Sequence, residues 1–235
     1  MTVYFEHLTN LKLLKNNLNH IGFELDRSRP SFARIGKEAH LCLNRAMVEA
    51  LKGTANIAIT GRPKSKNREA FYKKGNGPHY KIVKETVNNC KKAWRYSKPI
   101  VWPEDKIKFE RINYKVYNFD DYLINFYDLL AMIQTECYMY RYLDSKPIHV
   151  TDEDMVLLEG LHEQVRNEYE HFIPKSLSLP KHDLMLASLL CLNLTKNLLY
   201  NSGNVYKHER GIKTHLTESI KKLMRIKTTF ERRYL

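Results

Sequence analysis

Apolar residues recur every three or four positions along much of the chain, which is the spacing of one face of an α-helix. The first such stretch predicts a helix from Val3 to His20. A second predicted helix begins after Ser31, a residue type favoured at helix N-termini, and closes near Gly61. We expect the second helix to be largely buried, because its apolar stripe is continuous. The stripe consists of Ile35, Ala39, Leu43, Ala46, Met47, Ala50 and Leu51.

The stretch between residues 61 and 118 has a different character. Residues 62–77 combine Pro, Ser, Asn, Gly and basic side chains with too little apolar material for a packed element, which predicts a basic loop. Pro78 suits a helix start, and apolar residues continue at helical spacing to Trp94. Apolar and polar residues then alternate between residues 99 and 118, which predicts a small β-hairpin.

Helical spacing returns at Phe119 and predicts a helix over 119–142, before the break at Ser145-Lys146-Pro147. Thr151 and Asp154 have the spacing of a helix-capping pair, so we expect another helix to begin there. This helix ends by Pro174, because a proline disfavours helical geometry in the residue before it. Its apolar stripe consists of Leu158, Leu161, Val165, Tyr169 and Phe172.

Two further helices are predicted near the end of the chain. Residues 184–199 are apolar around most of the helix circumference, which predicts a central position. A last amphipathic helix is predicted over 216–226, with Lys221, Lys222 and Arg225 on its outer side. The pattern as a whole therefore predicts a mainly all-α protein.

Charge is unevenly distributed over these elements. The net charge is +13, from 39 basic and 26 acidic residues. Residues 61–115 carry a net charge of +11 and residues 205–235 carry +6, whereas residues 116–204 carry −7. Since neutralised phosphates supply most of the non-specific affinity for nucleic acids, this distribution predicts a polyanion-binding surface. A merely soluble basic protein is the simpler interpretation.

Several classes of protein lack support in the sequence. No stretch approaches the roughly eighteen uninterrupted apolar residues of a membrane span, so we expect a cytoplasmic protein without membrane association. The four cysteines include no C-x-x-C pair, which argues against the common zinc sites and favours buried thiols. Walker, dinucleotide-binding, zinc-protease and serine-hydrolase motifs do not occur, and we expect neither a cofactor nor a metal.

The helix that ends by Pro174 carries three candidate catalytic residues outside its apolar stripe: Arg166, Asn167 and His171. At about 100° per residue, Asn167 and His171 stand about 40° apart around the helix, whereas Arg166 and His171 stand about 140° apart. A single straight helix therefore does not aim Arg166 and His171 at one phosphate. Two copies related by a two-fold axis can present them to a shared cleft, and local unwinding before Pro174 is the alternative.

The segment Arg166-Asn167-Glu168-Tyr169-Glu170-His171 resembles the signature of the HEPN superfamily (higher eukaryotes and prokaryotes nucleotide-binding domain). In that signature an Arg, very often followed by Asn, precedes a His by four to six residues. The helices predicted at 119–142 and 182–200 resemble the family's helical arrangement around the motif. The resemblance implies one domain over residues 1–235, an up-and-down bundle with its core at about 31–60 and 119–203. Residues 61–118 then look like a basic insertion, and 205–235 like a basic C-terminal helix.

The resemblance implies a metal-independent endoribonuclease, usually a homodimer, often a toxin or antiphage effector that acts with an antitoxin or defence-system partner. The residue types suit this chemistry, in which the RNA 2′-hydroxyl attacks the neighbouring phosphate. His171 is the expected acid or base, because its titration range overlaps neutral pH. Arg166 is expected to hold the phosphate through its planar donors, and Asn167 to bind the same phosphate or orient His171.

Simpler structural roles exist for the same residues. Arg166 can pair with Glu170 or Glu163 on the helix surface, where such pairs contribute only a few tenths of a kcal/mol. His171 can satisfy carbonyl groups at the helix end. We interpret His162, one turn before Arg166, as a surface residue. The tyrosines around Arg141 suit stacking on bases, but we interpret them as core and rim residues.

The basic insertion is the predicted nucleic-acid-binding segment, through side chains that can follow a phosphate backbone. These are Lys64, Lys66, Arg68, Lys73 and Lys74. Three functions remain open at this point. The first is the ribonuclease, the second is a non-catalytic helical module that binds nucleic acid or a partner protein, and the third is a nucleotide-binding or nucleotidyl-transfer partner subunit.

Overall fold

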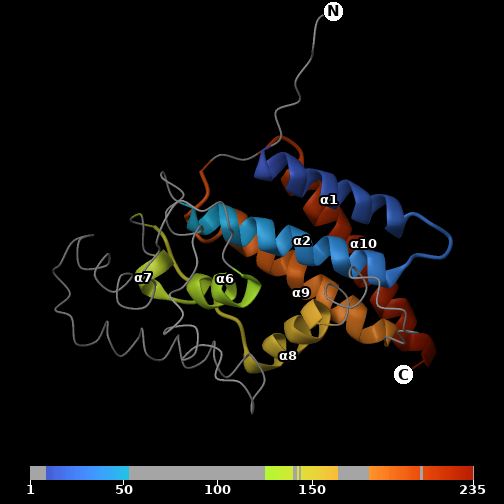
Figure 1. Ribbon diagram of the computed structural model, residues 1–235. Coiled ribbons are helices and arrows are strands. Elements are labelled where there is room, and N and C mark those ends of the chain that lie inside the picture. The colour runs from blue at the N-terminus through green and yellow to red at the C-terminus, as the bar shows by residue number, and fades with distance from the viewer. Residues whose placement is uncertain are drawn as a thin grey trace, which may run out of the picture. The chain divides into compact units, whose positions relative to one another are not determined.

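The structure, a computed structural model, is mostly helical and contains no strand among the residues that it describes. It describes residues 9–52, 125–139, 142, 144–163, 180–206 and 209–234. Its helices are α1 (Asn10–Leu25), α2 (Phe32–Leu51), α6 (Phe126–Ile133), α7 (Glu136–Met139), α8 (Asp152–Gly160), α9 (Lys181–Tyr200) and α10 (Ile212–Tyr234) (Figure 1). The all-α prediction is confirmed for these residues, whereas the HEPN-like bundle stays a prediction. The elements predicted within 61–118 lie outside the described residues.

The chain folds into two compact units. Unit 1 comprises Met1–Ala46, Gly160–Lys196 and Lys207–Leu235, and unit 2 comprises Met47–Glu159 and Asn197–Tyr206. Helices α2 and α9 each contribute residues to both units. The single domain with a basic insertion stays a prediction, because the insertion itself is not among the described residues.

Helix α1 ends later than the sequence pattern predicts. The Thr9 hydroxyl accepts the Lys12 backbone N–H at 3.1 Å, which caps the helix at its start. The helix continues to Leu25 rather than His20 because Ile21 and Leu25 extend the buried stripe. Val3 and its neighbours up to residue 8 lie outside the described part of the chain.

Helix α2 is buried along the whole predicted stripe, from Ile35 to Leu51. The Ser31 hydroxyl lies 3.5 Å from the Arg34 backbone N–H, in agreement with its predicted capping position. The helix ends at Leu51, well before Gly61. Gly53 is a sequence signal for this earlier end, because glycine is enriched just beyond helix C-termini.

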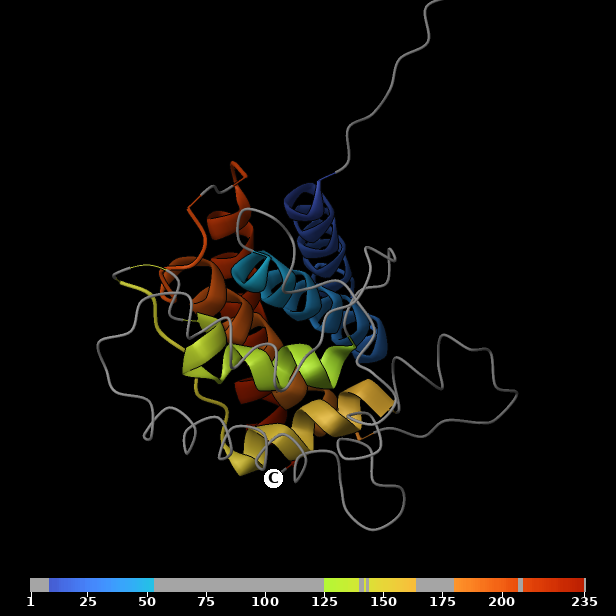
Figure 2. The same ribbon diagram turned by 60° about the vertical axis from the view of Figure 1, so that its left-hand side comes forward.

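Helices α1 and α2 form an antiparallel pair in unit 1 and lie next to each other in both ribbon views (Figures 1 and 2). At the open end of the pair, the Arg45 guanidinium donates to the side-chain oxygens of Asn10 and Asn17 at 3.1 and 3.0 Å. Near the middle, the Asn17 amide donates to Glu38 at 2.6 Å. Polar hydrogen bonds thus fix the register of the two helices.

Glu24 organises the connection between α1 and α2. Its buried carboxylate accepts the Ser31 backbone N–H at 2.8 Å and an Arg27 guanidinium N–H at 3.1 Å. The Ser31 hydrogen bond, assisted by Arg27 and Arg34, lowers the pKa of Glu24 against the opposing effect of burial. The charged form of Glu24 therefore stabilises this connection.

Helices α9 and α10 complete unit 1. Most of α9 is buried, as predicted for a central helix, and its exposed positions are Lys181, Asp183 and Asn193. Helix α10 extends beyond the predicted 216–226 at both ends, and it packs on α1. The two helices run in the same direction, because Lys15 lies beside Gly211 and Asp26 binds Lys222 at 2.6 Å.

Unit 2 corrects the prediction of one helix over 119–142. Helix α6 ends at Ile133, and α7 begins at Glu136. The interruption has a hydrogen-bonding cause, since the Ile133 carbonyl accepts the N–H of Ile148 at 2.9 Å, and the Thr135 hydroxyl donates to the Ala131 carbonyl at 2.7 Å. Apolar periodicity carries no information about a bond to a residue fifteen positions away.

A glycine turn after α9 closes unit 2. The Lys146 backbone N–H donates to the Ser202 carbonyl at 2.9 Å, and the Ser145 hydroxyl donates to Asn204 at 3.1 Å. Gly203 has φ +71°, in the left-handed region, and a Cβ there would lie 2.5 Å from the Asp144 carbonyl oxygen. Only glycine satisfies both conditions at this position.

Gly203→Ala is therefore expected to destabilise the protein by about 2–4 kcal/mol, since the strained backbone and the close contact with Asp144 act together. Urea unfolding followed by circular dichroism measures this change. Gly22→Ala in α1 is the matched control, because a Cβ there meets nothing within 4 Å and should stabilise the helix by about 0.5–1 kcal/mol. Equal stabilities of the Gly203→Ala variant and the parent would contradict the described turn.

The lowered pKa of Glu24 predicts a pH dependence of stability. The contribution of the charged Glu24 to the free energy of unfolding is complete at pH values above 4.5, which is the ordinary pKa of a glutamate carboxyl group. It is lost as the pH falls through the lower pKa that Glu24 has in the folded protein. The free-energy difference between the parent and Glu24→Gln should therefore be largest at neutral pH and shrink in acid. Urea unfolding at several pH values tests this, with the exposed Glu218→Gln as the control. A difference that stays constant with pH would show that Glu24 has no such role.

Candidate functional site

The residues predicted to form the site lie outside the described part of the chain. This applies to the candidate catalytic residues Arg166, Asn167 and His171. It applies equally to the predicted nucleic-acid-binding residues Lys64, Lys66, Arg68, Lys73 and Lys74. The described chain reaches Glu163, three residues before Arg166, so it includes the helix and the turn that lead into the motif.

Helix α8 begins as the sequence predicts. The Thr151 hydroxyl accepts the Asp154 N–H at 3.1 Å, and the Asp154 carboxylate accepts the Thr151 N–H at 3.2 Å. This reciprocal pair is a capping box with Asp in place of the usual Glu. The three acidic residues of the first turn also oppose the positive end of the helix dipole, and Leu158 is fully buried as predicted.

The helix widens immediately after α8. Residues Leu161–Glu163 form a π-helical turn, in which one extra residue is accommodated. Leu161 is buried against α2 within unit 1, and its Cδ1 atom lies only 2.9 Å from the place that a Cβ on Gly36 would occupy. Leu184 and Ser188 of α9 border the same point. Gly36 therefore permits close contact between α2 and this turn.

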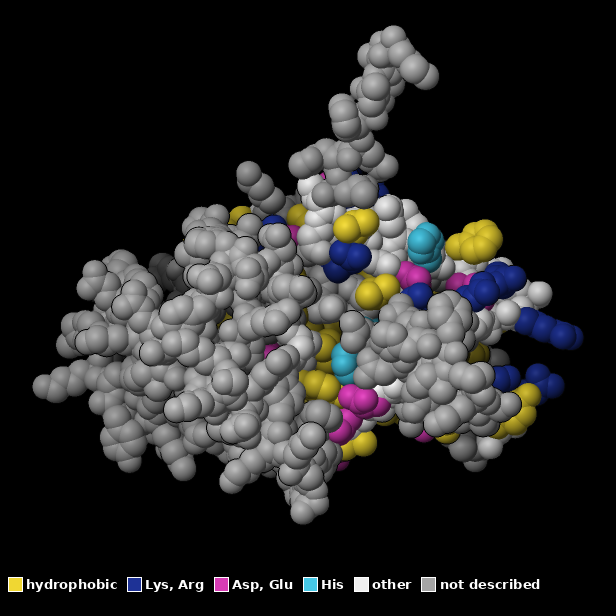
Figure 3. Space-filling model, in the orientation of Figure 1, with side chains coloured by type: hydrophobic (Ala, Val, Ile, Leu, Met, Phe, Trp, Pro, Cys, Tyr) yellow, Lys and Arg dark blue, Asp and Glu magenta, His cyan; other side chains and the backbone are white. Residues whose placement is uncertain are grey.

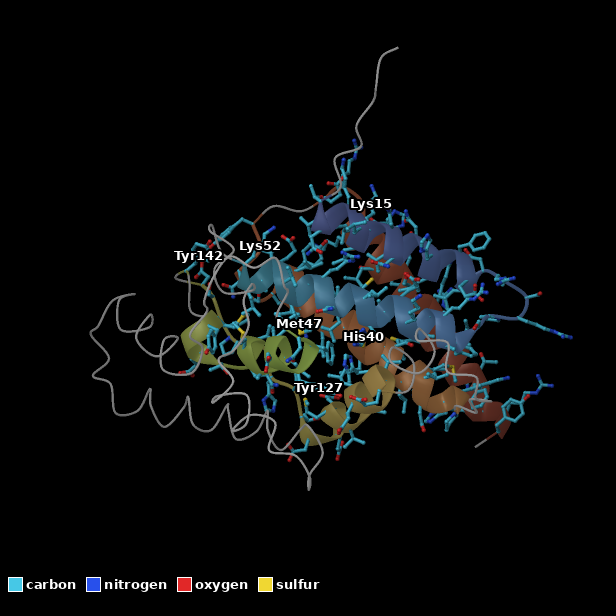
Figure 4. All side chains as sticks on the ribbon, in the orientation of Figure 1. Lys15, His40, Met47, Lys52, Tyr127 and Tyr142 are labelled. Carbon is cyan, nitrogen blue, oxygen red and sulfur yellow. The ribbon has the colours of Figure 1, made fainter. Side chains whose placement is uncertain are left out.

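His162 is buried, with 7% of its surface exposed, so its interpretation as a surface residue was wrong. Its Nδ1 atom lies 2.9 Å from Nε2 of His40, which is itself 1% exposed and lies on α2 (Figure 4). The physical reason is positional, since His162 follows the buried Leu158 by four residues and stands about 40° from it on a helix. This spacing was a signal for burial that sequence reasoning missed.

The geometry of the histidine pair restricts its protonation. A hydrogen bond between two imidazole nitrogens needs one donor and one acceptor, so a single proton lies between Nε2 of His40 and Nδ1 of His162. The ring centroids are 5.0 Å apart with an interplanar angle of 34°. Because both rings are buried, we assign this pair the role of holding the π-helical turn on α2 rather than touching a substrate.

Two buried thiols lie elsewhere in unit 1. Cys42 and Cys191 are free and fully buried, as predicted, and burial raises the pKa of both thiols. A thiol with a raised pKa remains protonated at neutral pH and is a poor nucleophile. The predicted burial of Cys90 and Cys137 concerns side chains outside the described set.

Two of the tyrosines considered for stacking have the expected core and rim positions, whereas Tyr140 lies outside the described residues. Tyr138 is 2% exposed, whereas Tyr142 is 39% exposed and packs edge-on against Tyr206 with the ring centroids 4.7 Å apart.

Within the described side chains, no cluster of three or more His, Cys, Asp or Glu residues has an arrangement suited to a metal ion. None of the described helices combines the length and apolar character needed to cross a lipid bilayer.

Comparisons with known proteins give no further assignment. No protein-family model, no curated protein and no solved structure matches this chain.

The histidine pair predicts a measurable coupling between α2 and the π-helical turn. His40→Leu and His162→Leu each leave a buried partner nitrogen without its hydrogen bond and should cost about 1–3 kcal/mol of stability. The double variant removes both partners, so its cost should be smaller than the sum by about 0.5–2 kcal/mol. A urea-unfolding double-mutant cycle measures this difference. Strictly additive costs would mean that the two rings do not interact.

Proposed function

We propose that the protein is a metal-independent endoribonuclease of HEPN type that cleaves RNA through attack of the ribose 2′-hydroxyl. The observation that carries the proposal is the helix that leads into the motif. Its predicted cap at Thr151 and Asp154 and its buried residues Leu158 and Leu161 are present up to three residues before Arg166. The apolar stripe predicted for this helix is also the reason why Arg166, Asn167 and His171 are expected to lie outside its buried face.

The proposed roles follow from the side-chain chemistry. His171 moves a proton between the 2′-hydroxyl and the leaving 5′-oxygen, as base or as acid. Arg166 donates hydrogen bonds to the phosphate as negative charge grows on its oxygens. Asn167 binds the same phosphate or orients His171. The products are a 2′,3′-cyclic phosphate and a free 5′-hydroxyl, and no metal ion is required.

The histidine pair suits this proposal because it fixes the chain close to the motif. His162 precedes Arg166 by four residues, and its hydrogen bond to His40 holds that turn on α2. A nuclease with a composite site needs such rigidity, since small displacements of catalytic groups lower the rate strongly. We propose a homodimer in which each copy contributes Arg166 and His171 to one cleft. An antitoxin or defence-system protein is the proposed regulatory partner.

The second candidate function is a non-catalytic helical module that binds nucleic acid. The observation that favours it is the strongly basic α10, whose exposed side includes Lys221 and Arg225. Such a module binds RNA through this exposed side of α10 and leaves the RNA intact. Both candidate functions include binding of RNA, so cleavage of the RNA is what distinguishes them.

Incubation of the purified protein with end-labelled RNA in EDTA tests the proposal. We expect cleavage to products with cyclic-phosphate ends, and a loss of at least about 100-fold in rate for His171→Ala and for Arg166→Ala. His149→Ala is the matched control, because His149 is an exposed histidine outside the motif, and its rate should equal that of the parent. Intact RNA, or cleavage that persists in His171→Ala, would refute the ribonuclease and favour the binding module.

A further inference from the structure

Helix α10 carries a line of exposed cations along one face. Lys221, Arg225 and Arg232 are all exposed and follow one another at intervals of four and seven residues. On an α-helix these intervals place all three within about 40° of one another and spread them over about 16 Å of helix length. Their charges therefore point to the same side of unit 1.

These cations differ from their neighbours on the same helix. Lys222 binds Asp26 at 2.6 Å, and Lys227 binds Glu231 at 2.6 Å. Within the described residues, by contrast, Lys221, Arg225 and Arg232 form no ion pair. The helix dipole accounts for a cation in the last turn, such as Arg232, but Lys221 and Arg225 lie well before that turn. No ion pair within the described part of the chain therefore neutralises the charge of Lys221 or Arg225.

The other side chains on this face indicate which partner it suits. Thr214 and Thr228 lie within about 20° of Lys221 around the helix, and Glu218 is the one carboxylate within about 60°. Hydroxyl and basic side chains are the groups that bind phosphate oxygens. Of the large apolar side chains that are exposed on the described part of α10, Met224 stands about 60° from Lys221 around the helix and Tyr234 about 140°, so the face lacks the apolar centre of a protein interface and the apolar stripe of a membrane-surface helix.

More cations surround the end of α10. Lys and Arg side chains gather at the end of unit 1 where α1 passes into α2 and where α10 ends (Figure 3). Arg29, in the connection between α1 and α2, and Arg34, in the first turn of α2, are exposed. The positive field of this end extends that of the cationic face and attracts a polyanion from a distance.

We propose that the α10 face formed by Lys221, Arg225 and Arg232 binds the phosphate backbone of single-stranded RNA. The proposal rests on the proposed function for the identity of the polyanion, since RNA is the substrate there. Binding at this face is nevertheless separate from cleavage, because none of the three residues belongs to the motif. Each cation neutralises one phosphate, so the contribution of the face depends on the salt concentration.

RNA binding by the full chain in the His171→Ala background tests the proposal. Affinity for a fluorescent single-stranded RNA is measured by anisotropy at several salt concentrations. The triple variant Lys221→Gln/Arg225→Gln/Arg232→Gln should bind at least about tenfold more weakly at low salt. The slope of log affinity against log salt should become shallower by about 2, since each phosphate contact on a single strand contributes about 0.7.

A matched pair of double variants separates direct contact from diffuse attraction. Lys221→Gln/Arg225→Gln removes two cations that form no ion pair with any described residue, and Lys222→Gln/Lys227→Gln removes two paired cations from the same helix. Only the first should weaken binding and flatten the salt slope. Equal losses in both would overturn the proposal in favour of a general field effect. Circular dichroism shows that each variant keeps its helices.

Two further outcomes would overturn the proposal. One is a salt slope that is the same in the triple variant as in the parent. The other is a triple variant that binds anionic phospholipid vesicles more weakly than the parent does but binds RNA equally well. The proposed function fails separately. If the triple variant has the expected shallower salt slope but the unmutated protein leaves RNA intact, the nuclease is refuted and RNA binding by the α10 face is supported. If the unmutated protein cleaves RNA but the salt slope of the triple variant is unchanged, the nuclease is supported and RNA binding by the α10 face is refuted.

Discussion

The hydrogen bond between His40 and His162 joins two segments that are 122 residues apart in the chain. It is buried, so water cannot replace either partner when the other is lost. It also fixes a turn of unusual width directly beside Gly36, where α2 has no side chain to hold the turn away. The position of the chain as it enters the motif depends on this contact. A substitution at Gly36 or His40 is therefore expected to displace the part of the chain that leads to Arg166.

In unit 1, the buried cysteine and histidine side chains have structural roles, whereas other side chains are exposed and can contact a ligand. Cys42 and Cys191 are reactive residue types, but burial keeps their thiols protonated. The histidine pair occupies its facing nitrogens with one shared proton. Among the described residues of this unit, the exposed side chains are mainly cationic or hydroxyl-bearing, which suits recognition of phosphates more than covalent catalysis.

The sequence predicted those features that depend on local periodicity and capping. The buried stripe of α2, the capping box of α8 and the central position of α9 follow from the spacing of apolar and capping residues. Features set by distant partners were not predictable in this way. The break at Thr135 depends on Ile148, and the burial of His162 depends on His40. Of the candidate site, the approach helix was predicted, and the placement of Arg166, Asn167 and His171 stays a prediction.

The parallel packing of α1 and α10 bears on how the protein is made. Asp26 and Lys222 are 196 residues apart, and the ribosome adds about 5–20 residues per second, so α1 emerges about 10–40 s before its partner. During that interval the apolar side of α1 that α10 will cover remains exposed. Unit 1 thus becomes complete only after α10 has been synthesised, which delays the assembly of any activity that depends on it and gives chaperones a defined period in which to bind the nascent chain.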